Sequence, residues 1–179
     1  MAVLMVLAAS VSAVAVLAGG AGRSGGGAAR VSSAEALFEQ MMASNARAAR
    51  LAATAVARSC QEAAPGTPSR AVSLADLARA VTLRQSVLNT LGTNQSELLA
   101  MPDGELLVTD LSQATNAELT VDKDQQGWLQ DLQATGCYSA PTNDIDYRAA
   151  SVAVPAAVEA GQRLVTAWAK IDPTARSPG

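Results

Sequence analysis

The sequence contains no histidine, and aromatic residues make up only 3% of its 179 positions. The absence of histidine excludes Ser-His-Asp and Cys-His catalytic arrangements, histidine metal sites and the side chain that most often carries protons near neutral pH. Lysine occurs only twice, and the net charge is −3. A mildly acidic chain without a basic run is a poor candidate for binding nucleic acid, so we predict no nucleic-acid partner.

Signatures of strands and of nucleotide binding are also missing. Almost no stretch alternates between apolar β-branched and polar residues as a half-buried strand does. No glycine-rich loop follows a strand, as nucleotide binding requires; the glycines of GGAGRSGGG follow an apolar segment, which is typical of a linker. We therefore expect an all-α protein and predict no cofactor.

The first 22 residues carry no charge. Residues 2–18 are apolar except for two serines, which predicts a signal peptide or a transmembrane anchor over residues 1–22. A Gly/Ala-rich linker follows at residues 23–31. The first basic residues, Arg23 and Arg30, come after the apolar run, and in an uncleaved segment this order favours a cytoplasmic C-terminal part. Cleavage and anchoring therefore stay open.

Cys60 and Cys137 are the only cysteines of the chain. An even cysteine count behind a targeting segment is typical of a disulfide in an exported protein, so we predict a Cys60–Cys137 disulfide. The alternative is two buried thiols in a cytoplasmic protein. Two cysteines without histidine are too few for a structural zinc site, which takes four ligands, and we predict no metal.

Residues 32–172 show helical periodicity, and a disordered tail is expected at 173–179. The cap signals and breakers predict four helices: Ser32 or Ser33 to about Cys60, Ser73 to about Gly92, Asp103 to Thr135 or Gly136, and about Asp144 to Ile171. Asp144 and Asp146 are interpreted as partners of the last helix's N-terminus. Pro155 is expected to kink or break that helix.

Long helices joined by short loops predict an up-down-up-down four-helix bundle. In that topology the first and third helices run the same way, so their C-terminal ends lie at the same end of the bundle. This places Cys60 and Cys137 together, which agrees with the predicted disulfide.

Two charged residues interrupt the apolar stripes of the predicted helices. Arg84 lies between Val81 and Leu88 on the second helix, and Glu118 takes the equivalent place on the third. A buried Arg84–Glu118 pair would fix the register of two helices or form the floor of a ligand pocket. The alternative is that Arg84 reaches the rim along its aliphatic stem and Glu118 is solvated.

The stretch that begins at Asp122 has the spacing of a calcium-binding loop. Asp122 and Asp124 take its first and third positions, and Gly127 takes its sixth. Gln126 and Gln133, however, stand at the fifth and twelfth positions, where carboxylates normally bind the ion. The same residues continue the apolar stripe of the third helix, so we interpret them as helix and assign no metal.

From Leu83 onward the sequence resembles uncharacterised extracytoplasmic helical proteins of actinobacteria. The stretches that carry the resemblance are LRQSVLNTL, LLAMPDGELL, VDKDQQGW followed by GC, and DYRAAS followed by AW. The resemblance implies a secreted or membrane-tethered helical bundle, and it supplies no activity.

These observations predict a non-enzymatic extracytoplasmic binding module, secreted or held at the membrane by its N-terminal segment. Its partner would be another protein, a cell-envelope component or a small ligand. One alternative is a hydrolase that uses carboxylates alone, such as Glu118, Asp122 and Asp124. Another is an N-terminally anchored protein that faces the cytoplasm. A concave pocket with two of these acids would favour the enzyme, and a filled core would favour the module.

Overall fold

The computed structural model describes residues 33–59, 68–135 and 144–171. Several sequence predictions lie outside these residues: the signal or anchor segment, the linker, the tail, and the disulfide between Cys60 and Cys137. Among the helices that the structure describes, none combines the length and the hydropathy that crossing a membrane requires.

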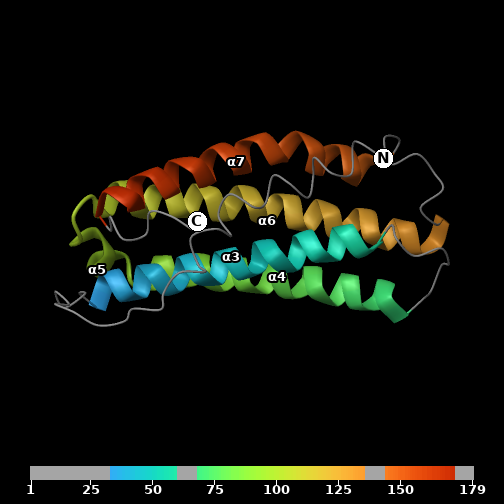
Figure 1. Cartoon of the computed structure of the whole chain (residues 1–179), viewed down its shortest axis with the longest axis horizontal. Coiled ribbons are helices and arrows are strands. Elements are labelled where there is room, and N and C mark those ends of the chain that lie inside the picture. The colour runs from blue at the N-terminus through green and yellow to red at the C-terminus, as the bar shows by residue number, and fades with distance from the viewer. Residues whose placement is uncertain (1–32, 60–67, 136–143, 172–179) are drawn as a thin grey trace, which may run out of the picture.

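The described chain is helical. Its elements are α3 (Ser33–Ser59), α4 (Pro68–Thr93), α5 (Gln95–Leu99), α6 (Gly104–Thr135) and α7 (Ile145–Ile171). No strand occurs within these ranges, which confirms the all-α prediction for this part of the chain. Figure 1 shows α3, α4, α6 and α7 side by side along the long axis, each running opposite to the one before it, with α5 at one end.

The start of α7 agrees with the predicted capping residue. A carboxylate oxygen of Asp144 accepts hydrogen bonds from the backbone N–H groups of Asp146 and Tyr147, both at 2.9 Å. These N–H groups belong to the first turn and have no partner inside the helix. Asp144 therefore caps α7, and Asp146 adds a negative charge to its first turn.

Two local predictions are wrong. Ser73 does not cap the second helix, because α4 already begins at Pro68 and Ser73 lies buried inside it. Proline suits the first helical position, since its fixed φ is helical and its missing N–H is not needed there. The expected break at Pro155 does not occur, and α7 continues through it. Both Pro155 and Ser151, whose carbonyl the proline leaves without a donor, are exposed, so water can reach that carbonyl.

The core consists of two apolar clusters. The α5-end cluster contains Phe38 and Trp168, whose rings stack with centroids 5.0 Å apart; its other large members are Met41, Met42, Val87, Leu91, Leu98, Met101, Leu107, Leu111 and Leu164. The opposite cluster contains Trp128 and Tyr147, which meet edge to face at 5.1 Å; its other large members are Val56, Leu77, Val121, Leu129 and Val154. Buried polar residues lie between the two clusters.

α5 packs against the start of α6 so closely that only glycine fits at position 104. A Cβ atom at Gly104 would collide with the carbonyl oxygen of Leu98 and lie 3.0 Å from the Cα atom of Leu99. Both are backbone atoms, so neither can move without α5. Asp103, just before, adopts φ 52°, in the left-handed region that aspartate tolerates better than most residues.

Replacing Gly104 by alanine is expected to lower the free energy of unfolding by about 1–3 kcal/mol, the usual cost of forcing extra volume into a packed site. Gly92→Ala is the matched control, since a Cβ there would meet nothing within 4 Å. Because alanine is the better helix former, that control is expected to gain about 0.5–1 kcal/mol. Urea unfolding followed by circular dichroism measures both changes. Equal effects of the two substitutions would contradict the close packing of α5.

Candidate functional site

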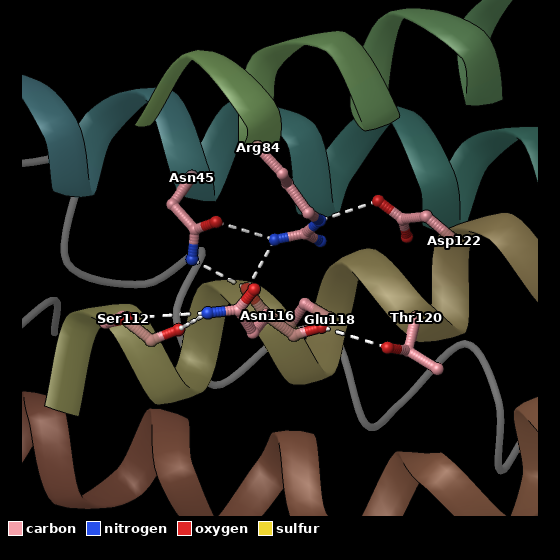
Figure 2. Close-up of polar contacts among 7 residues, drawn as sticks. All are labelled: Asn45, Arg84, Ser112, Asn116, Glu118, Thr120 and Asp122. Atoms are coloured by element: carbon pink, nitrogen blue, oxygen red, sulfur yellow. Dashed lines mark hydrogen bonds and ion pairs between the residues drawn. The ribbon is translucent and has the colours of Figure 1, made fainter. Parts of the chain in front are cut away.

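Four buried polar side chains lie between the two apolar clusters. They are Asn45 on α3, Arg84 on α4, and Glu118 and Asp122 on α6, and none is more than 5% exposed. We call these four residues the Arg84 layer. Glu118 and Asp122 stand four residues apart on one helix, so their side chains project from the same face. Figure 2 shows the Arg84 side chain reaching from α4 toward both of them.

The contacts of the Arg84 layer join all four residues. The Nε atom of Arg84 donates to Oδ2 of Asp122 at 2.6 Å. Its Nη1 atom donates to Oδ1 of Asn45 at 2.7 Å and also to the Glu118 carboxylate. Asn45 in turn donates from Nδ2 to Oε2 of Glu118 at 2.6 Å. Asn45 thus accepts from the guanidinium and donates to a carboxylate, which orients both (Figure 2).

The structure brings Arg84 and Glu118 together in the core, which is one of the two arrangements that the sequence left open. Arg84 is 1% exposed, so its guanidinium does not reach the rim. A third partner, Asp122, binds the same guanidinium, although the sequence placed that aspartate in a calcium-loop pattern. Asn45 was not singled out by the sequence analysis. The sequence feature that could have identified it is its position three residues after Met42, which places a polar residue on the apolar side of α3.

Burial dominates the electrostatics of the two acids. It raises the pKa of Glu118, while the charge of Arg84 and the hydrogen bond from Asn45 work in the opposite direction and the charge of Asp122 adds to the rise. Burial likewise raises the pKa of Asp122, against the opposing effect of Arg84. One guanidinium faces two carboxyl groups. The layer therefore has no spare positive charge to offset the second carboxylate.

A small cavity adjoins the Arg84 layer. Its volume is about 10 Å³, counted as the space open to the centre of a water molecule. The layer contributes Arg84, Glu118 and Asp122 to its lining, and the rest is apolar: Val121, Val154, Ala157 and Val158. This is about the space that one water molecule needs.

The polar face of α6 extends beyond the layer in both directions. Thr115 lies three residues before Glu118, and Gln125 lies three residues after Asp122, so all four share one face. Thr115 and Gln125 are buried, and their side-chain oxygens have no hydrogen-bond partner among the described residues. Such atoms usually cost about 1–3 kcal/mol each when they are left unpaired. Apolar side chains at the positions of Thr115 and Gln125 on α6 would pack in the core without the cost of unpaired polar atoms.

The calcium-loop pattern does not form a loop, because Asp122, Asp124 and Gln126 all lie within the continuous helix α6. Residues two apart on a helix point in different directions, so these three cannot surround one ion. Asp122 binds Arg84, whereas Asp124 is partly exposed near the start of α7. Desolvation and the charge of Asp146 raise the pKa of Asp124.

Three other acids gather where α6 and α7 meet. Carboxylate oxygens of Asp131, Asp144 and Asp146 lie within 4.8 Å of one another. Asp144 already uses its carboxylate to cap α7, and Asp146 belongs to the first turn of that helix. The helix N-terminus accounts for this grouping, so we assign no metal to it.

No protein-family model matches the chain, and neither a curated protein nor a solved structure matches it. The functional interpretation therefore depends on the residues and their geometry.

Proposed function

We propose that this chain is a non-enzymatic binding or interaction module of the bacterial cell envelope, built as an up-down-up-down four-helix bundle behind an N-terminal targeting or anchor segment. The bundle is supported by the alternating directions of α3, α4, α6 and α7 (Figure 1). Short loops between antiparallel helices are the usual connections of that fold.

The observation that carries the proposal is the state of the two buried acids. A hydrolase of the carboxylate-pair type needs two carboxyl groups about 5–9.5 Å apart on either side of a cleft that the substrate enters. Glu118 and Asp122 instead bind the same guanidinium and adjoin a cavity of about 10 Å³. A core that is filled in this way favours a module over a carboxylate-only hydrolase.

The proposed location is supported by the uncharged residues 1–22 and by the even cysteine count. The resemblance to extracytoplasmic actinobacterial proteins, read from Leu83 onward, points the same way. An N-terminally anchored protein that faces the cytoplasm is the alternative, because Arg23 and Arg30 follow the apolar run.

Thiol accounting in the native host tests the location. Intact cells are treated with an alkylating reagent under non-reducing conditions, and the mass of the protein is measured by mass spectrometry. The mass is measured again after the protein has been reduced and alkylated a second time. We expect no alkylation before reduction and alkylation of both Cys60 and Cys137 after it, since an oxidising compartment keeps the bridge closed. Two thiols that react without reduction would contradict an extracytoplasmic module and favour the cytoplasm-facing alternative.

The hydrolase alternative predicts a different result from the module when an acid is neutralised. Glu118→Gln keeps the shape of the side chain and removes its charge. If this variant folds but no longer restores the phenotype of a deletion strain, a catalytic role for the carboxyl group is favoured. Full restoration favours the module, and Glu159→Gln, at a 74% exposed side chain, is the matched control.

A further inference from the structure

The Arg84 layer contains two carboxyl groups but only one positively charged group. Among the residues that the structure describes, the charged groups that act on the acid pair are Arg84 and the two acids themselves. Among the described residues, α3 contributes the neutral Asn45 and α7 contributes Val154, Ala157 and Val158. With both acids ionised, the layer would therefore have a net charge of −1.

The surroundings cannot solvate that charge. The adjoining cavity has room for about one water molecule, and its α7 wall is apolar. Isolated charges are so costly in such an environment that a titratable group takes up a proton instead. Two acids and one guanidinium carry no net charge when exactly one of the acids is protonated.

We propose that the Arg84 layer is a proton-binding site, in which Glu118 and Asp122 hold one proton between them at neutral pH and the bundle loses stability when that proton leaves for the solvent. The contacts with Arg84 and Asn45 use Oε2 of Glu118 and Oδ2 of Asp122. The other carboxyl oxygen of each acid is thus the atom that can carry the proton. The two acids titrate as a coupled pair, so the proton belongs to both.

The sign of the pH dependence follows from burial, which raises the pKa of both acids above their ordinary values of 4.5 and 3.8. The folded protein then binds the proton more tightly than the unfolded chain does. The stability from this site is fully present below the ordinary carboxyl pKa and is lost as pH rises through the raised one. Across that window the unfolding equilibrium constant rises by up to about tenfold per pH unit for the one proton released.

Two isosteric variants and one control test the linkage. Glu118→Gln and Asp122→Asn each leave one acid opposite Arg84, so the layer is neutral without a proton. The unfolding equilibrium constants of these variants are expected to change less with pH than that of the wild type. Glu159→Gln, which neutralises an exposed acid paired with Arg163 at 2.9 Å, is expected to keep the wild-type slope. Urea unfolding at closely spaced pH values above about 4.5 provides these constants.

Infrared spectroscopy of the wild-type protein tests the site without any variant. A protonated carboxyl group has a C=O stretch that is separate from the carboxylate bands. We expect this band at neutral pH in the full chain, and we expect it to disappear as the pH is raised. Its absence at neutral pH would overturn the proposal, as would equal pH slopes in the wild type and the two isosteric variants. If a variant fails to fold, the infrared result still decides.

Discussion

Replacing Arg84 by methionine is expected to lower the free energy of unfolding by about 3–5 kcal/mol at neutral pH, the usual cost of removing one partner of a buried ion pair. Methionine keeps the length and much of the volume of the aliphatic stem. The substitution removes the cation that binds both Glu118 and Asp122, and it removes the donor to Asn45. Urea unfolding followed by circular dichroism measures the loss.

Arg79→Met is the matched control for this prediction, since Arg79 lies on the same helix, five residues before Arg84. Its side chain is 73% exposed and pairs with Asp76 at 3.5 Å, so its loss is expected to cost less than about 1 kcal/mol. Similar losses in the two variants would contradict a decisive role of the buried charges.

The pH dependence of Arg84→Met separates lost charge from lost packing. Without the guanidinium, both carboxyl groups can enter the folded core only in their protonated form. The deficit of the variant relative to the wild type is therefore expected to shrink as the pH falls toward the ordinary carboxyl pKa values of 4.5 and 3.8. A deficit that is the same at every pH would assign the loss to packing alone.

The starts of three of the long helices could be predicted from the sequence because their local signals agree with the packing. Ser33, Asp103 and Asp144 stand immediately at or before the starts of α3, α6 and α7, as their cap positions predict. The start of α4 could not be placed in this way. Ser73 has the sequence pattern of a capping residue, but it lies inside α4, and the pattern alone does not distinguish the two positions. Pro155 predicted a break that does not occur. It lies on an exposed face of α7, where water can hydrogen-bond to the carbonyl that the proline leaves without a donor.

The candidate site could be predicted only in part. The stripe positions of Arg84 and Glu118 predict that the two residues face each other inside the bundle, but a long side chain at such a position can also turn outward to the rim. Asp122 lies one helical turn from Glu118, and this four-residue spacing already indicates that the two acids share one helix face. Asn45 has no charge to draw attention to it. Its contribution becomes visible only when α3, α4 and α6 are placed together, because its two hydrogen bonds go to two different helices.

The Arg84 layer also determines how the core is divided. Apolar residues occupy the interior on both sides of it, with an aromatic pair in each cluster, Phe38 with Trp168 and Trp128 with Tyr147. A continuous apolar core would allow helices to slide by one turn with little loss. The layer opposes such sliding, because any shift of α4 relative to α6 would separate the guanidinium of Arg84 from both carboxyl groups.

Replacing the whole layer by apolar residues is therefore expected to have the opposite effect to removing Arg84 alone. The quadruple variant Asn45→Ala, Arg84→Met, Glu118→Leu and Asp122→Val keeps the summed side-chain size near that of the original four residues. We expect its free energy of unfolding to exceed that of the wild type by about 1–4 kcal/mol, because no desolvated charge stays in the core and the two apolar clusters join. Urea unfolding of this variant beside Arg84→Met measures the contrast.

The contrast between these two variants determines what the layer contributes. If the quadruple variant is more stable than the wild type but gives a weaker near-ultraviolet circular dichroism signal, the layer fixes the register at a cost in stability. If both stability and tertiary signal rise, register is already fixed by the aromatic pairs, and the charged groups are retained for their chemistry. A quadruple variant as unstable as Arg84→Met would contradict the argument, since it would mean that the buried hydrogen bonds of Arg84 stabilise the bundle more than the apolar contacts that replace them.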